Sequence, residues 1–192
     1  METFKDQPVL AFASQQEFHD WLDRHHADAG PFWLRIYKKG SGKPTVTYAE
    51  ALDEALCYGW IDSTKQAYDE ESFLQRFSAR KPRSVWSQVN RDHVARLTSE
   101  GRMQPAGLRA VEEAQRNGQW EKAYASSSRI TVPEDLQARL DLDAEAKAFF
   151  EGLDKTNRYA ILYRIQNVKK AETRLKRLDW AMDLLKRKEK IY

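Results

Sequence analysis

The hydrophobic and polar positions divide the first third of the chain into amphipathic helices and short strands. Two capping boxes, Ser14–Glu17 and Thr47–Glu50, each precede apolar residues on one helix face. These are Phe18, Trp21 and Leu22 after the first box, and positions i, i+3, i+4 and i+7 counted from Tyr48 after the second. In each box the hydroxyl caps a backbone N–H group and the glutamate reaches back toward the cap. The pattern predicts one helix from Ser14 to about His26 and a second from Thr47 to Gly59, where a glycine can adopt the left-handed conformation that ends a helix.

Three segments rich in aromatic and β-branched residues predict strands. They cover residues 32–38, 60–66 and 73–79, and the turn AYDEES at residues 67–72 joins the last two. Their pairing gives a small antiparallel sheet of about three strands. A sheet of this size needs helices on one face to be stable.

The remainder of the chain has the spacing of helices alone. A helix capped by Ser84 or Ser87 is expected to run to about Glu100, and another from Pro105 to Asn117. After a connector at residues 118–131, helices are expected to open at Thr131–Glu134 and to cover about 144–153, 157–168 and 171–188. The apolar residues of the last helix form one stripe: Ala171, Leu175, Leu178, Met182 and Leu185.

These elements predict an α+β fold that is predominantly helical. A small antiparallel sheet is packed with helices, and a C-terminal helical region follows. We expect an α+β domain at residues 1–125 and a C-terminal helical region at residues 130–192 packed on it, with one compact unit as the alternative.

The amino-acid composition indicates whether the chain can form a packed core and in which cellular compartment it is expected. An apolar fraction of 41% and an aromatic fraction of 11% support a packed core rather than disorder. The single cysteine, Cys57, excludes an internal disulfide, fits a reducing compartment and lies in a helical pattern as a buried thiol. The N-terminus lacks a charged segment followed by an apolar run, and no stretch approaches ~18 apolar residues, so a cytoplasmic protein is expected.

The net charge of +3 is unevenly distributed. Residues 155–192 carry a balance of +8, and residues 1–154 a balance of −5. A basic tail is typical of a solvated helix face or of a surface for nucleic acid or an acidic partner. The cations that would contact nucleic acid are Lys169, Lys170, Arg174, Lys176 and Arg177.

The segment RFSARKPRSVWSQVN at residues 76–90 carries the candidate site. Its cations precede the start of a helix, and helix N-termini attract anions. Arginine holds phosphate or carboxylate through two parallel hydrogen bonds. The candidate ligand-binding residues are Trp60, Arg76, Arg80, Lys81, Ser84, Trp86 and Asn90.

Asp62 is the candidate catalytic residue of this group. Antiparallel pairing of residues 60–66 with 73–79 is expected to bring Asp62 opposite Arg76 or Ser78. It would act as an acid–base group or would orient Arg76 or the substrate. The alternative is an Asp–Arg pair at a corner of the sheet, with Trp60 and Trp86 as core residues.

The chain lacks the short motifs of cofactor sites and of common catalytic sites. It has no GxSxG, Walker-type loop, GxGxxG or CxxC pair, so no cofactor and no metal are expected. His93 is expected to be a satisfied histidine on a helix face.

Four motifs, ALCYGWIDS at residues 55–63, the segment at 76–90, GRMQPAGL at 101–108 and KKAETRLKR at 169–177, resemble those of the YdeI/OmpD-associated family, also labelled bacteriocin protection. The resemblance runs from about Phe32 to Arg187. It implies a bacterial cytoplasmic protein linked to envelope stress and resistance, of unassigned biochemical activity. The family pattern points at Trp60, Asp62, Arg76, Arg80, Ser84, Trp86 and Asn90.

Three functions follow from these observations. The favoured one is binding of a small anionic molecule, phosphate or carboxylate, with enzymatic activity and oligomeric state left open. The alternatives are nucleic-acid binding through the basic C-terminal helices and a protein adaptor that docks through residues 171–188.

Overall fold

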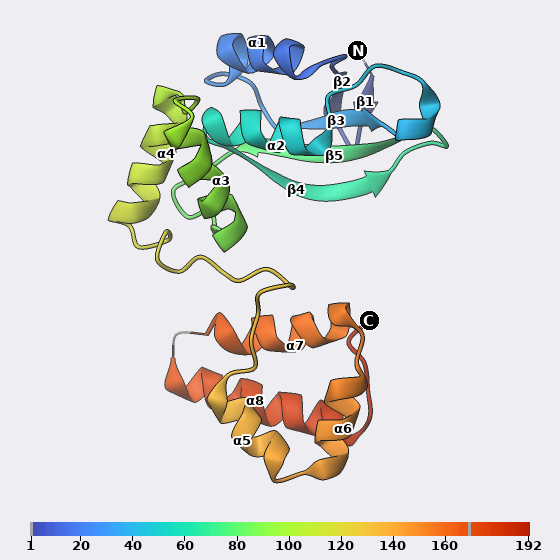
Figure 1. Ribbon diagram of the computed structural model, residues 1–192, viewed down its shortest axis with the longest axis vertical. Helices are drawn as coiled ribbons and strands as arrows, with labels where there is room; N and C mark the ends of the chain where they lie inside the picture. The colour runs from blue at the N-terminus through green and yellow to red at the C-terminus, as the bar shows by residue number, and fades with distance from the viewer. Residues whose placement is uncertain (1, 169) are drawn as a thin grey trace. The chain divides into compact units, whose positions relative to one another are not determined.

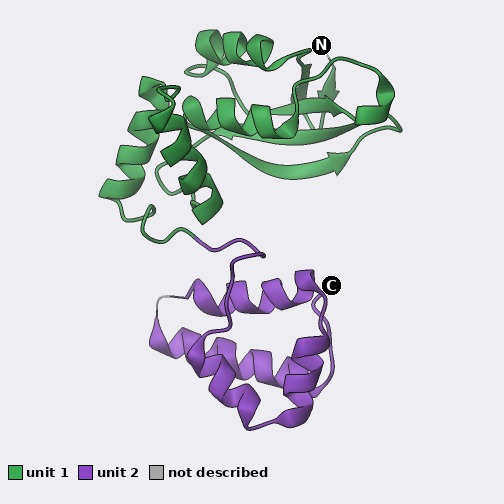
Figure 2. Cartoon of the chain, in the orientation of Figure 1, with its two compact units in different colours: residues 1–123 green, residues 124–192 purple. Residues whose placement is uncertain are grey.

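The computed structural model describes residues 2–168 and 170–192, and the chain divides into two compact units (Figure 2). Unit 1 comprises residues 1–123 and unit 2 residues 124–192. Within the described ranges, no helix is long and apolar enough to cross a membrane. The α+β class is confirmed, and unit 2 is helical, with no strand among its described residues.

Unit 1 is built on a mixed five-stranded sheet (Figure 1). The order across the sheet is β1 (Thr3–Phe4), β2 (Gln7–Ala11), β3 (Phe32–Tyr37), β5 (Ser72–Ala79) and β4 (Trp60–Ala67). The β2–β3 pair is parallel, and the other three pairs are antiparallel. The three predicted strands are thus present, at the centre and one edge of the sheet.

The expectation of a purely antiparallel sheet of about three strands is wrong because of the N-terminal hairpin. β1 and β2 are joined by Lys5 and Asp6, whose φ angles are +48° and +59°. A two-residue hairpin turn needs such positive angles, but its usual sequence signal is Asn-Gly or Asp-Gly. Pro8 within β2 also argues against a strand, but the ladder between β2 and β3 begins only at the next residue, Val9.

Helices α1 (Gln15–His25) and α2 (Tyr48–Cys57) contribute to the core of unit 1. Alternate residues of β3, Phe32 among them, point into this core together with Phe18 of α1 and Phe77 of β5. A short 3-10 turn at Lys39–Ser41 lies between β3 and α2.

Both predicted N-caps of these helices are observed. Ser14 Oγ accepts a hydrogen bond from the Glu17 backbone N–H (3.2 Å). Thr47 and Glu50 form a full capping box, in which each side chain accepts from the other's backbone N–H. These caps set where α1 and α2 begin.

Helices α3 (Gln88–Ser99) and α4 (Pro105–Arg116) complete unit 1. Ser87 caps α3, since its Oγ accepts from the Asn90 backbone N–H (3.0 Å). α4 lies directly on the end of α2: a Cβ added at Gly107 would be 2.1 Å from the Cys57 carbonyl oxygen. Only glycine permits this approach.

The described residues of unit 2 form four helices around a separate core. They are α5 (Glu134–Asp141), α6 (Ala144–Gly152), α7 (Lys155–Gln166) and α8 (Ala171–Lys186). The apolar stripe of α8 is buried in this core through Leu178, Met182 and Leu185, whereas Leu175 is 54% exposed.

Candidate functional site

The strand register separates Asp62 from Arg76. Asp62 is directly opposite Phe77, and Arg76 is opposite Trp33 on the other neighbouring strand. Residues opposite each other share a face, and consecutive residues of a strand point to opposite faces. Asp62 therefore shares the face of Phe77, and Arg76 lies on the other face of the sheet.

The predicted pairing of Asp62 with Arg76 or Ser78 is therefore wrong by one residue. Ser78 pairs with Ile61, and the β4–β5 ladder shifts between Asp62 and Lys65. A one-residue slip in register moves every side chain to the opposite face, and the turn sequence alone did not determine that register.

Asp62 and Arg76 instead form hydrogen bonds with two different residues. Tyr48 Oη donates to Asp62 Oδ2 (2.8 Å), and Arg76 Nε donates to Gln7 Oε1 (2.9 Å). Gln7 belongs to the N-terminal hairpin. The structure thus gives the two predicted site residues different surroundings.

Trp60 is a core residue in this structure. It is buried, and its Nε1–H donates to the His26 carbonyl oxygen (3.2 Å). Its ring packs against Trp21 and Phe32. Asn90 is also buried, in the first turn of α3.

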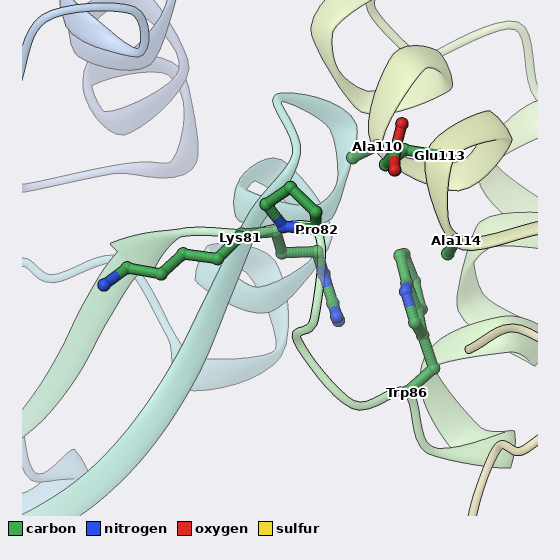
Figure 3. Close-up of a pocket in the computed structure, with 7 residues that line it drawn as sticks. Lys81, Pro82, Trp86, Ala110, Glu113 and Ala114 are labelled. Atoms are coloured by element: carbon green, nitrogen blue, oxygen red, sulfur yellow. The ribbon is translucent and has the colours of Figure 1, made fainter. Parts of the chain in front are cut away.

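Arg80, Lys81 and Trp86 do come together. With three residues of α4 and Pro82, they line a cavity of about 90 Å³, hereafter the Arg80–Trp86 cavity (Figure 3). Figure 3 shows the Lys81 side chain directed away from Trp86. The lining residues from α4 are Ala110, Glu113 and Ala114.

The Arg80 guanidinium is held flat at one wall of this cavity. Its Cζ lies 3.4 Å from the centroid of the Trp86 ring, and Nη1 donates to the Val85 carbonyl oxygen (3.1 Å). Trp86 is only 3% exposed and makes an edge contact with Trp120 at 4.9 Å between centroids. Stacking and the hydrogen bond together restrict the rotamers of Arg80.

Ser84 closes the turn beside the cavity. Its Oγ accepts from the Lys81 backbone N–H, and its own N–H donates to the Lys81 carbonyl oxygen, both at 2.9 Å. Asn117 at the end of α4 fixes the same turn, because its Nδ2 donates to the Pro82 carbonyl oxygen (2.6 Å). Of the two serines considered as caps for α3, Ser84 thus has this other role.

Sequence reasoning missed the contribution of α4. Ala110, Glu113, Ala114 and Asn117 follow helical spacing, so they share one face of that helix. That spacing was a usable signal for a common surface. Nothing local, however, indicated that this surface lies against the turn at residues 80–84.

A second depression, of about 490 Å³, lies over a polar network in unit 1. It is lined by Gln15, Gln16, His19, Glu54 and Arg102. The Glu54 side chain is 6% exposed and is bonded by Gln15 Nε2 (2.6 Å), His19 Nδ1 (2.8 Å) and Arg102 Nη2 (2.7 Å). Because the Glu54 carboxylate is almost fully buried and protein groups bond both of its oxygens, the network is best explained as a structural link between helices.

The neighbouring carboxylate, Asp53, extends this network to α3. Its Oδ1 is 2.8 Å from His93 Nδ1, and both oxygens accept from Arg96 Nη2 at 2.7 Å. Burial raises the pKa of Asp53, but the hydrogen bonds from Arg96 and His93 outweigh it and lower the pKa below its usual value. The prediction of a satisfied helix-face histidine at His93 is confirmed.

Cys57 is a free, buried thiol, as expected. Burial, together with the nearby Glu54 carboxylate, raises its pKa to about 12. At neutral pH it is a thiol rather than a reactive thiolate.

The C-terminal cations have mixed surroundings. Arg174 forms a double hydrogen bond with Asp135 (2.6 and 3.0 Å), and Lys176 pairs with Glu172 (2.7 Å). Lys170 and Arg177 are exposed. Lys169 lies outside the described residues. Nucleic-acid binding through this face stays a prediction.

Two family models match the chain in succession. Residues 10–110 match the model described as Domain of unknown function (DUF8412), and residues 129–188 match the model described as Bacteriocin-protection, YdeI or OmpD-Associated (OmdA). No curated protein and no solved structure matches the chain. The resemblance to the YdeI/OmpD-associated family is thus confirmed at residues 129–188, whereas the motifs between residues 55 and 108 lie within the range of the other model. The chain belongs to the DUF8412 family through residues 10–110 and carries a bacteriocin-protection, YdeI or OmpD-associated domain at residues 129–188.

Proposed function

We propose that unit 1 binds a small anion, of the size of phosphate or a carboxylate, in the Arg80–Trp86 cavity. The observation that supports this proposal is the Arg80 guanidinium, which is stacked on Trp86 at 3.4 Å and forms a wall of the cavity. A planar guanidinium is suited to two parallel hydrogen bonds with an oxyanion.

The restricted side chain of Arg80 lowers the entropy cost of binding a ligand. A surface arginine loses rotamer freedom when it binds a ligand, and this loss weakens the affinity. Here the ring of Trp86 and the Val85 carbonyl oxygen already restrict the side chain. The entropy cost therefore falls on folding rather than on ligand binding.

The size of the cavity limits the ligand. A volume of about 90 Å³ corresponds to about three water molecules in the liquid. Such a space holds a phosphate or carboxylate group, but the base and sugar of a nucleotide would have to remain outside it. Enzymatic turnover is not required for this function.

The family match of the C-terminal domain suggests the biological role in which this binding takes part. The description of the family model that matches residues 129–188 includes bacteriocin protection. We therefore place anion binding by unit 1 within a stress or resistance role of the whole chain.

A thermal-shift panel tests the proposal. It contains phosphate, acetate, chloride and a short oligonucleotide, each at low and high salt. A ligand that binds only the folded state adds about 2.7 kcal/mol at 100 times its dissociation constant. We expect phosphate or acetate to raise the melting temperature of unit 1 at both salt concentrations.

Two arginine variants provide the comparison. Arg80→Ala should remove the shift, whereas Arg83→Ala, an exposed cation of the same turn that does not line the cavity, should retain it. Equal shifts in both variants would refute binding at Arg80. Stabilisation by the oligonucleotide alone, and only at low salt, would instead support the basic C-terminal helices.

A further inference from the structure

The Arg80–Trp86 cavity has a carboxylate in its lining as well as a cation. Glu113 of α4 is among the lining residues, and Figure 3 shows it on the helix that faces Pro82 and Trp86. Lys81 also lines the cavity, but Figure 3 shows its side chain directed away from Trp86, and the rest of the lining is apolar: Pro82, the Trp86 ring and two alanines. A ligand in this small space therefore meets both a guanidinium and a carboxylate.

The position of Glu113 is set by its own neighbours. It pairs with Arg116, and its Oε1 accepts from Asn117 Nδ2 at 3.4 Å. Asn117 also binds the Pro82 carbonyl oxygen, so the carboxylate and the turn of the cavity share one anchor. Glu113 remains about 30% exposed and is thus not sealed within these contacts.

These two groups make opposite demands on a ligand. Arg80 only donates hydrogen bonds, whereas an ionised carboxylate only accepts them. An anion whose oxygens all lack hydrogen is attracted by Arg80 and repelled by Glu113. An anion that still carries an O–H group can accept from Arg80 and donate to Glu113.

We infer that the cavity selects an oxyanion that retains a proton, namely hydrogen phosphate or the monoanion of a phosphate ester, over sulfate or an ionised carboxylate. The inference rests on the proposed function, which it narrows to one class of ligand. The role of Glu113 is specificity: a site that requires a hydrogen bond from its ligand rejects an analogue without the donor.

A comparison of phosphate with sulfate measures the contribution of the hydrogen bond from the ligand to Glu113. The two anions are both tetrahedral, but at neutral pH phosphate keeps at least one O–H group and sulfate has none. Calorimetric titration of the full chain with each anion, at equal ionic strength, should show phosphate binding at least about tenfold tighter, the worth of one hydrogen bond to a charged group. This comparison needs no variant.

A Glu113→Gln variant tests the residue itself. The amide can donate as well as accept, so it no longer requires a proton on the ligand. The variant should bind sulfate and phosphate within about threefold of each other, since the discrimination of one charged hydrogen bond is gone. Glu112→Gln, an exposed neighbour on α4 that does not line the cavity, should keep the preference for phosphate.

A pH comparison separates free phosphate from a phosphate ester. The second pKa of an ester phosphate is about 6, so methyl phosphate loses its last O–H group between about pH 5 and about pH 8. Its affinity should fall at least about tenfold over that range, by the worth of the lost hydrogen bond. Inorganic phosphate keeps an O–H group throughout and should retain its affinity.

The outcomes distinguish this inference from the proposed function. Equal affinity of the unaltered chain for phosphate and sulfate would overturn the inference and leave anion binding intact. An unchanged preference in Glu113→Gln, or pH-independent binding of methyl phosphate, would also overturn it. If the unaltered chain binds none of phosphate, sulfate and acetate, the proposed function fails with the inference.

Discussion

Glu54 is a single residue on which several elements of unit 1 depend. Its buried carboxylate is bonded by Gln15 and His19 of α1 and by Arg102, which precedes α4. Burial of a charge is costly unless such partners compensate it. The network therefore stabilises the fold only while all its members are present.

A Glu54→Gln substitution should lower the free energy of unfolding by about 1–3 kcal/mol, because charged hydrogen bonds are lost and an amide group must be accommodated. Urea denaturation followed by tryptophan fluorescence measures this change. The exposed Glu121→Gln serves as the control and should be nearly neutral. A Glu54→Gln protein as stable as the unaltered chain would show that the network contributes nothing.

Asp53 makes part of the stability dependent on pH. Its pKa in the folded state is below the usual 3.8, so the unfolded chain binds the proton more readily. The stabilisation is present above the unfolded pKa and is lost as the pH falls below about 5 and toward the folded value. We expect Asp53→Asn to be less stable near neutral pH and to lose less stability on acidification.

Melting temperatures between neutral and acidic pH check this expectation. Asp28→Asn, at an exposed aspartate after α1, should retain the acid sensitivity of the unaltered chain. Parallel curves for Asp53→Asn and the unaltered chain would contradict the assignment.

At the scale of elements, a close backbone contact with α2 helps to position α4. Gly107 lies against the carbonyl groups of Leu56 and Cys57, and the Gln104 N–H donates to the Cys57 carbonyl oxygen (3.1 Å). This contact brings Glu113 and Asn117 of the same helix to the turn at residues 80–84.

Gly107→Ala should destabilise unit 1 by at least about 2 kcal/mol, because the new methyl group overlaps fixed backbone atoms. Gly30→Ala is the matched control, since nothing lies within 4 Å of the position of its Cβ. Chemical denaturation of both variants gives the comparison. A Gly107→Ala variant with unchanged stability would mean that α4 can move without cost.

The sequence was informative for elements with local signals and less so for their pairing. The capping boxes at Ser14 and Thr47 and the glycine at 59 place helix ends through contacts between residues close in the chain. The N-terminal hairpin escaped prediction because its turn uses Lys5 and Asp6 at positive φ. The register of β4 and β5 depends on a shift between Asp62 and Lys65 that no local sequence pattern indicates.

In the candidate site, too, the groupings of residues close in the sequence were predictable and those that depend on long-range pairing were not. Arg80, Lys81 and Trp86 are neighbours in the sequence, and they line one cavity. Asp62 and Arg76 were grouped through an assumed register, and the actual register puts them on opposite faces of the sheet. Glu113 was missed because its place in the cavity depends on how α4 packs.

At the scale of the whole molecule, each unit has its own hydrophobic core. The core of unit 1 includes Phe18, Phe32 and Phe77, whereas that of unit 2 includes Leu136 and Ile161. A segment with a separate core can in principle fold by itself.

We therefore expect the fragment 124–192 to be helical and to unfold cooperatively on heating, as measured by circular dichroism. The fragment 1–123 should behave likewise and should retain the phosphate-induced thermal shift. An unstructured fragment 124–192 would show that its core is insufficient for folding.

The central claim is that a small anion binds beside Trp86, and the indole N–H signals of the six tryptophans test it most directly. Two-dimensional NMR spectra recorded during a phosphate titration, with the Trp86 signal assigned from Trp86→Phe, measure the response at each ring. We predict a saturable shift that is largest at Trp86, smaller at Trp120 and absent at Trp60. A titration that leaves Trp86 unchanged, or that moves all six signals equally, would contradict the account.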